Sequence, residues 1–230
     1  MIISSQGFGH FTKGLNNQDF GIETPRMVLV LDGCSGAKYS EVGTRLFAQL
    51  FTRKEECDKL EKFEVNVKEV FEDLIDMMWK FYPRSEEFEN RFITENLLFT
   101  VIACFETEDQ FVVKLFGDGY IITKNNEGCV SYLKFSYGKC PPYFAYKFCK
   151  IDASFQKYQD YEFKTFYFDK KTFSRVAIAT DGILPMVKGD ISEIDKYISA
   201  GDSFMISSAI KSHRQSFFDD VTIAMVGGES

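Results

Sequence analysis

The amino-acid sequence predicts an α+β fold in which two stacked antiparallel sheets are covered by helices, and three observations support this prediction. Strand-like segments follow one another in the middle of the chain, with only short turn sequences between them. Helical periodicity is confined to two blocks, one before and one after those strands. The composition, 45% hydrophobic and 16% aromatic, is that of a chain with a large core. Helices in blocks and strands in hairpins favour this layering over a parallel βαβ sheet.

Eight segments have the apolar pattern of strands. They are Met27 to Leu31, Leu97 to Glu106, Gln110 to Phe116, Tyr120 to Lys124, Cys129 to Phe135, Phe163 to Phe168, Arg175 to Thr180 and Val221 to Val226. Three of the intervals between consecutive strands are typical turn sequences: Glu108-Asp109, Gly117-Asp118-Gly119 and Asn125-Asn126-Glu127-Gly128. The middle of the chain is therefore predicted to be an antiparallel meander of hairpins.

Helical periodicity predicts two helices before the meander and two after Asp181. They are Ser40 to Phe51, a longer helix whose apolar stripe runs from Val67 to Trp79, a short helix near Ile191 to Ile198, and Ser203 to His213. The segment Ser136 to Glu162, rich in aromatic residues and prolines, shows neither period.

Length and composition limit the classes of function. At 230 residues the chain fits one domain, which we expect to span residues 1–230. A formal charge of -7 and a pI near 5.0, with no basic patch, argue against nucleic-acid binding. Six cysteines without CxxC spacing and only two histidines argue against a Cys/His metal site.

The sequence also indicates the compartment. No uninterrupted apolar segment approaches the length needed to span a membrane, so no membrane association is predicted. The opening MIISSQGFGH lacks a basic region followed by an apolar stretch, and no export signal is visible there. We therefore expect a reduced, cytoplasmic protein.

Four short acidic motifs carry the functional signal: Asn17-Gln18-Asp19, Asp32-Gly33, Asp181-Gly182 and Asp219-Asp220. The last three directly follow apolar runs. Each motif alone is ordinary turn chemistry, because Asp caps its own backbone and Gly accepts positive φ. Brought together, however, carboxylates at strand ends form an all-oxygen site for hard divalent cations. Such a site predicts the hydrolysis of phosphate esters by metal-activated water.

Five blocks occur in a fixed order along the chain: GFGHFTKGLNNQDF, VLVLDGCSG, LFGDGY, VAIATDGI and FDDVTIAMV. From about Gly7 to Val226 the chain resembles the PPM (type 2C) metal-dependent serine/threonine protein phosphatases, and its opening resembles a bacterial branch with Gln-Asp in place of Glu-Asp. The resemblance implies a four-layer α-β-β-α sandwich with a binuclear Mn²⁺ or Mg²⁺ site at one edge. It also implies hydrolysis of phosphoserine and phosphothreonine by a water that bridges the two cations, on a phosphorylated protein substrate with a cognate Ser/Thr kinase.

The resemblance assigns roles by position. Asp32 would bridge the two cations and the Gly33 carbonyl would complete one of them, while Asp181 and Asp219 would hold the other. Asp19 would act through cation-bound water, and Asp118 matches the position of a third, weaker cation. The implied catalytic residues are Asp19, Asp32, Asp181 and Asp219.

Three positions depart from the family pattern. Cys34 stands where animal members have His and many bacterial members have Met. His10 is therefore the remaining candidate for a histidine that acts as general acid and protonates the leaving group. The arginine that grips phosphate before the first acidic motif is missing, and Lys13 could supply a point charge there without bidentate geometry. Asp220 stands where Asn is more usual, although this branch tolerates Asp there, and we expect it to fix the neighbouring backbone.

Three functions fit these observations. The first is an active metal-dependent protein phosphatase, since all four core acidic positions are retained. The second is a pseudophosphatase that serves as a regulatory phosphoprotein-binding module, because the arginine and the histidine are missing. The third is a phosphoesterase for small phosphorylated molecules, because the stretch between Gly119 and Asp181 leaves little room for a protein-docking flap.

Overall fold

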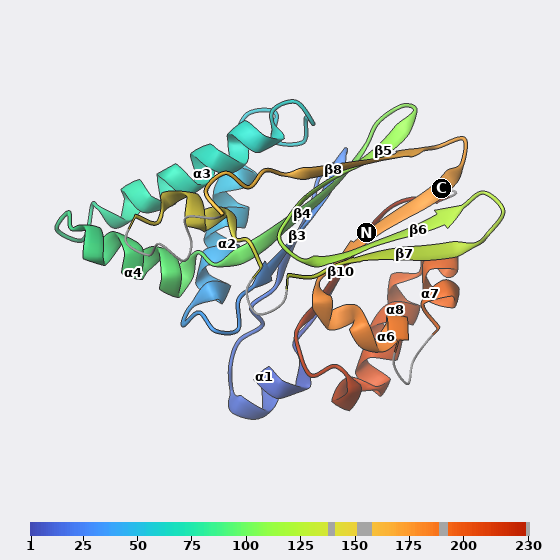
Figure 1. Cartoon of the computed structure of the whole chain (residues 1–230). Coiled ribbons are helices and arrows are strands. Elements are labelled where there is room, and N and C mark those ends of the chain that lie inside the picture. The colour runs from blue at the N-terminus through green and yellow to red at the C-terminus, as the bar shows by residue number, and fades with distance from the viewer. Residues whose placement is uncertain (138–140, 151–157, 189–192, 229–230) are drawn as a thin grey trace.

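The computed structural model describes residues 1–137, 141–150, 158–188 and 193–228. Two five-stranded antiparallel sheets form its centre (Figure 1). The first sheet contains β1 (Ile2–Ser5), β10 (Val221–Gly227), β9 (Phe173–Ala179), β6 (Gly119–Asn125) and β7 (Val130–Phe135), in that spatial order. The second contains β2 (Phe20–Glu23), β3 (Met27–Gly33), β4 (Phe99–Glu106), β5 (Gln110–Phe116) and β8 (Lys164–Asp169).

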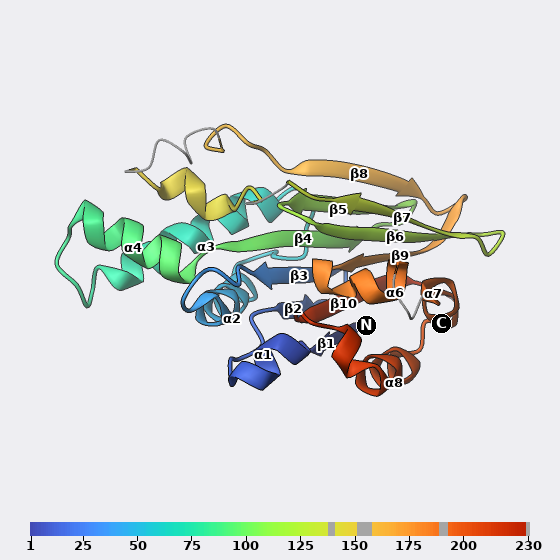
Figure 2. The same ribbon diagram turned by 60° about the horizontal axis from the view of Figure 1, so that its bottom comes forward.

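Helices lie on the outer faces of both sheets, as Figure 2 shows. The second sheet is covered by α2 (Ser40–Phe51), α3 (Phe63–Met78) and α4 (Glu86–Asn96), and the first sheet by α6 (Leu184–Lys188), α7 (Ile194–Ala200) and α8 (Ser203–Ser212). A short helix, α1 (Phe8–Lys13), and three 3₁₀ turns, η1 (Phe144–Phe148), η2 (Asp181–Ile183) and η3 (Arg214–Ser216), complete the described elements. None of the described helices is long and apolar enough to cross a membrane.

Three apolar layers hold the four structural layers together. Along β3 the side chains alternate, as the period of two in a strand requires: Leu29 and Leu31 face the α2–α3 helices, and Val28 and Val30 face the other sheet. A third cluster packs β9 and β10 against α7 and α8. The structure therefore confirms the predicted α+β fold with two helix-flanked antiparallel sheets.

The long apolar segments were predicted well. Helix α2 has the predicted bounds, and α3 begins at Phe63, before the stripe from Val67. The Phe71 ring of α3 lies 5.3 Å from Phe47 of α2 and 5.2 Å from Phe99 of β4, centroid to centroid. Aromatic contacts at these spacings add to the burial of apolar area. Cys104 is buried between the two sheets, as expected for a core residue.

The predicted meander is wrong at one turn. The Glu108-Asp109 and Asn125–Gly128 turns do join hairpins, β4–β5 and β6–β7. The Gly117–Gly119 segment, in contrast, leaves β5 in one sheet and enters β6 in the other. Both glycines have positive φ, +112° and +134°, which a hairpin and a sheet-to-sheet crossing can equally require. The turn residues alone therefore did not distinguish the two.

Several short elements were not predicted from periodicity. β1 and β2 have four residues each and lie at sheet edges, and α4 buries only Ile93 in the described core. These elements are too short or too weakly apolar to show a period. The short helix predicted near Ile191 is α7, which begins at Ile194; residues 191 and 192 lie outside the described residues.

Candidate metal centre

The strand register brings the acidic motifs to one edge of the sandwich. Phe20 of β2 pairs with Leu31 of β3, so continuing this register places Asp19 opposite Asp32. Asp32 itself pairs with Thr100, at the start of β4. Ala179 pairs with both Tyr120 and Ile223, so the residues that follow β9 lie beside those that precede β6 and β10. The segments that carry Asp19, Asp32, Asp118, Asp181 and Asp219 therefore meet at this edge.

Asp19 is a buried carboxylate held by a single hydroxyl. The side chain is 3% exposed, and its Oδ2 accepts a hydrogen bond of 2.8 Å from Thr180 Oγ1. Thr180 is itself fixed, because its Oγ1 accepts from the Thr222 N–H at 2.9 Å. Burial raises the pKa of Asp19 well above its usual range; the Thr180 hydrogen bond opposes this shift, and the charge of Asp220 adds to it.

Asp32 and Asp181 lie close together across the edge. The Asp181 N–H donates to Asp32 Oδ2 at 3.4 Å. Burial, followed by the charges of Asp19 and Asp181, raises the pKa of Asp32 well above its usual range. Burial and the charge of Asp219 likewise raise the pKa of Asp181. These carboxylates therefore repel one another.

Asp118 faces the same group of charges from the link between the two sheets. Burial and the charge of Asp181 raise its pKa from 3.8 to about 6. The Lys134 ammonium, on β7, lowers the pKa of both Asp118 and Asp181. Lys134 is thus a cation beside the acidic cluster that the sequence patterns did not single out.

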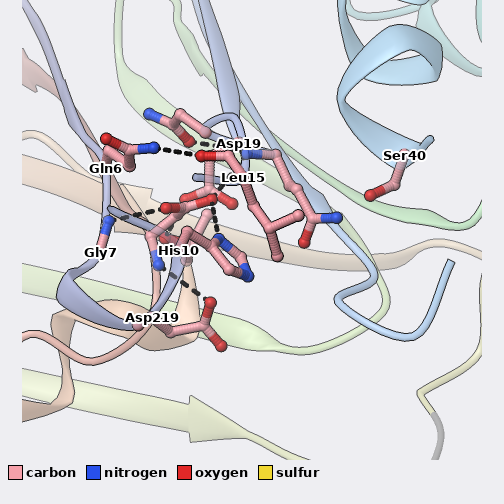
Figure 3. Close-up of polar contacts among 12 residues, drawn as sticks. Gln6, Gly7, His10, Leu15, Asp19, Ser40 and Asp219 are labelled. Atoms are coloured by element: carbon pink, nitrogen blue, oxygen red, sulfur yellow. Dashed lines mark hydrogen bonds and ion pairs between the residues drawn. The ribbon is translucent and has the colours of Figure 1, made fainter. Parts of the chain in front are cut away.

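Asp220 has the opposite environment to its neighbour Asp219. The Asp220 side chain is buried and accepts three hydrogen bonds: from the Gly7 N–H at 2.7 Å, the Gln18 N–H at 2.6 Å and His10 Nδ1 at 2.8 Å (Figure 3). Asp219 is exposed, and its Oδ1 accepts from the Asp220 N–H at 2.9 Å. Asp220 therefore ties the Gly7–Asp19 segment to the last strand, while Asp219 stays accessible.

Two glycines allow the segments to approach this closely. A Cβ at Gly182 would lie 1.8 Å from the Asp220 carbonyl oxygen, and one at Gly33 would lie 2.6 Å from the Gln18 carbonyl oxygen. Any larger residue would push the acidic loops apart. Neither glycine has a positive φ, so the Asp-Gly pairs require glycine for the close approach of the acidic segments and not for a turn conformation.

The structure places His10 against Asp220 and Lys13 at the surface. The His10 side chain is 10% exposed and is engaged with Asp220, so it anchors α1 to the strand edge. Lys13 is exposed, with its Nζ 5.9 Å from the centre of the Phe218 ring. Arg45, the arginine close to this loop, donates from Nη2 to the Asn17 carbonyl at 2.9 Å. Its guanidinium thus supports the loop backbone.

Cys34, the residue that departs from the family pattern, lies against Tyr143. The Tyr143 side chain is 6% exposed, and burial together with the adjoining Cys34 thiol raises its pKa. Tyr143 comes from the Ser136–Glu162 segment, which showed no sequence period. No sequence signal marked it as a neighbour of the acidic edge.

The chain matches a protein-family model over most of its length. The model of the family described as "Protein phosphatase 2C" matches residues 6–214. The chain belongs to the protein phosphatase 2C family. The match ends before Asp219, and no curated protein sequence matches the chain significantly.

Solved structures of bacterial phosphatases share the fold of this phosphatase 2C chain. Serine/threonine phosphatase Stp1 from Staphylococcus aureus has a TM-score of 0.60 at 15% identity, covering 100% of this chain and 94% of its own. PppA, a regulatory component of T6SS in Pseudomonas aeruginosa, has a TM-score of 0.65 at 12% identity, with coverages of 99% and 96%. The catalytic domain of PstP in complex with 2 manganese ions has a TM-score of 0.62 at 16% identity, with coverages of 98% and 95%.

The donor set of the acidic edge fits hard divalent cations. Carboxylates dominate it. Burial and, after it, the charges of neighbouring carboxylates raise the pKa of Asp19, Asp32, Asp118 and Asp181, and bound dications would relieve the repulsion. Among the described residues, the set of His, Cys, Asp and Glu groups with ligand atoms all within 4.8 Å is His10, Asp219 and Asp220. The oxygens of Asp220 are already engaged by Gly7, Gln18 and His10, so Asp219 is the member of that set whose carboxylate is accessible to a cation. A two-metal site holds its ions about 3.5–4 Å apart. Its ligands are spread around both ions, so they need not form one tight cluster.

Proposed function

We propose that this phosphatase 2C protein hydrolyses phosphoserine and phosphothreonine in proteins, with two Mn²⁺ or Mg²⁺ ions and a third, weaker ion at the acidic edge. The observation that carries the proposal is the convergence of Asp19, Asp32, Asp118, Asp181 and Asp219, with the pKa of four of them raised by burial and by one another. In this proposal residues 1–230 act as one domain, on substrates supplied by a Ser/Thr kinase.

The roles in this proposal are those that the family resemblance assigns. Asp32 would hold both main ions, the Gly33 carbonyl would complete one of them, Asp181 and Asp219 would hold the other, and Asp118 would hold the third. The ions, when bound, would supply Lewis acidity that activates water and neutralises the phosphate. A manganese-bound relative with the same fold supports this assignment.

The chain's own residues would orient the reactants. Asp19 is held rigidly by Thr180, so its free carboxylate oxygen can accept a hydrogen bond from water in one fixed direction. Asp219 is exposed, so a phosphate on a protein surface can reach this carboxylate from solvent. The Lys134 ammonium beside Asp118 and Asp181 would attract the phosphate dianion.

The test is hydrolysis of p-nitrophenyl phosphate and of a phosphoserine peptide, with and without Mn²⁺. We expect turnover that requires the cation, stops on chelation and is lost in Asp32→Asn. Asp109→Asn, the same change at an exposed turn, serves as the matched control and should behave as wild type. Equal turnover by Asp32→Asn and wild type, or none by wild type with Mn²⁺ or Mg²⁺, would disprove the proposal.

A second candidate is a regulatory module that binds phosphoproteins without turning them over. The observation in its favour is that His10, the candidate proton donor, is engaged by Asp220. Calorimetry distinguishes the two functions. Tight binding of a phosphopeptide in chelator, with no hydrolysis when Mn²⁺ is added, would favour the module.

A further inference from the structure

A basic surface hollow lies beside the acidic edge. It is formed where α1 meets the end of α8 and η3, two regions that lie side by side in Figures 1 and 2. Its volume is about 570 Å³, and its lining includes Phe11, Lys211, His213 and Arg214. No part of the proposed chemistry uses it.

The cations of this hollow have no acidic partners. Within the described ranges, Lys211, Arg214 and the nearby Lys13 form no ion pair, whereas Lys54 and Lys114, for example, are paired with glutamates. In a chain with a formal charge of -7, three unpaired cations at one place are a local reversal of charge. Such a surface attracts acidic ligands.

Aromatic rings hold these cations at the surface. The Arg214 guanidinium lies 3.8 Å from the centre of the Phe11 ring, and Lys13 Nζ lies 5.9 Å from that of Phe218. Both rings are themselves exposed, Phe11 by 53% and Phe218 by 67%. A guanidinium stacked on a ring keeps its edge N–H groups free to bind carboxylates in a bidentate manner.

The hollow is joined directly to the acidic edge. The Phe8 and Gly9 N–H groups donate to the Phe217 and Phe218 carbonyls at 2.7 and 2.9 Å, and Asp219 follows immediately. Since a residue spans at most about 3.6 Å, Arg214 lies within about 18 Å of Asp219 along the backbone. An extended peptide crosses that distance in about five residues.

We propose that this hollow binds an acidic segment of the phosphoprotein substrate, within about five residues of the phosphorylated serine or threonine. The inference rests on the proposed function, because it names the substrate sequence that the same site would select. Carboxylates of the substrate would pair with Arg214, Lys211 and Lys13, and its phosphate would then lie over the acidic edge. The preference would appear in KM, since these contacts are made equally in ground and transition states.

The experiment compares two phosphoserine peptides, one with Asp and Glu flanking the phosphoserine on both sides and one with Ala there. We expect wild type to prefer the acidic peptide by about tenfold in kcat/KM, as a few exposed ion pairs can supply, and the preference to weaken as salt rises. In Lys211→Glu combined with Arg214→Glu the preference should vanish. Lys171→Glu, in the exposed turn between β8 and β9, changes the net charge by the same amount as Lys211→Glu alone and should keep the preference that Lys211→Glu weakens.

The outcomes separate the two proposals. Activity of wild type on p-nitrophenyl phosphate without any preference between the peptides would overturn the docking surface and leave the phosphatase function intact. A preference that survives both Lys211→Glu alone and the double variant would also overturn it; the single variant changes an exposed side chain and should fold. If wild type hydrolyses nothing, the phosphatase function fails, and fluorescence anisotropy decides the surface by whether the double variant loses affinity for the labelled acidic peptide.

Discussion

Asp220 and the carboxylates around it lie at the same edge of the sandwich, yet they have opposite electrostatic environments. Three donors satisfy Asp220, and it joins the Gly7–Gln18 segment to β10. Asp19, Asp32 and Asp181 instead have a raised pKa, because burial and like charges outweigh the hydrogen bonds they accept. Acidic residues at the same edge can therefore have different roles. A carboxylate that accepts several hydrogen bonds stabilises the fold, and one surrounded by like charges is available to bind a cation.

The largest expected effect is the loss of the satisfied carboxylate. Asp220→Ala leaves the Gly7 and Gln18 N–H groups and the His10 ring buried without an acceptor, and should destabilise the protein by about 3–5 kcal/mol. Thermal unfolding of the metal-free protein should show a Tm roughly 10 °C lower. Asp109→Ala, at an exposed turn, should leave the Tm unchanged. An equally small shift for Asp220→Ala would contradict its role as an anchor.

The repelling carboxylates should respond in the opposite direction. Asp32→Asn removes one charge from the cluster, so the metal-free protein should be as stable as wild type or more stable. Mn²⁺ at about 100 times its Kd should stabilise wild type by about 2.7 kcal/mol and Asp32→Asn by much less. Melting curves with and without the ion measure both effects. A lower metal-free Tm for Asp32→Asn would mean that Asp32 is a structural group like Asp220.

Thr180 connects the two kinds of environment and should have an intermediate effect. Thr180→Val removes the hydroxyl that orients Asp19, and loss of such a supporting group typically costs about 10–100-fold in activity or metal affinity. Thr180→Ser retains the hydroxyl and should retain most of the activity. Turnover of p-nitrophenyl phosphate with a Mn²⁺ titration tests the pair, and identical values for Val and Ser would refute the orienting role.

The smallest expected effect is on pH dependence. The pKa of Asp118, raised from 3.8 to about 6, means that the folded protein binds more protons than the unfolded chain between those values. Metal-free stability should therefore fall as pH rises through that window and stay low above it. Asp118→Asn should flatten the fall, and stability that rises from pH 4 to 6.5 through this group would contradict the raised pKa.

The sequence predicted the features that depend on long apolar periods and on the order of motifs. Helix α2 and strands such as β5 were placed from their burial pattern, and the acidic residues from the five blocks. It could not predict that Gly117–Gly119 crosses between sheets, because the same residues suit a hairpin. Nor could it separate Asp219 from Asp220, since adjacent, identical side chains differ only in donors supplied from more than 200 positions away.

The pairing of β1 with β10 has a consequence for how the protein is made. Gly7 and Asp220 are 213 positions apart, so the anchor of the acidic edge is a contact of very high sequence separation. Closing so long a loop is slow, and residues near the start of the chain must wait for strand β10 to emerge from the ribosome. The sheet that contains β3 and β4, together with helices α2 and α3, can form earlier, because its contacts are more local in the sequence. The acidic edge would then be completed only after β10 had been synthesised and paired with β1.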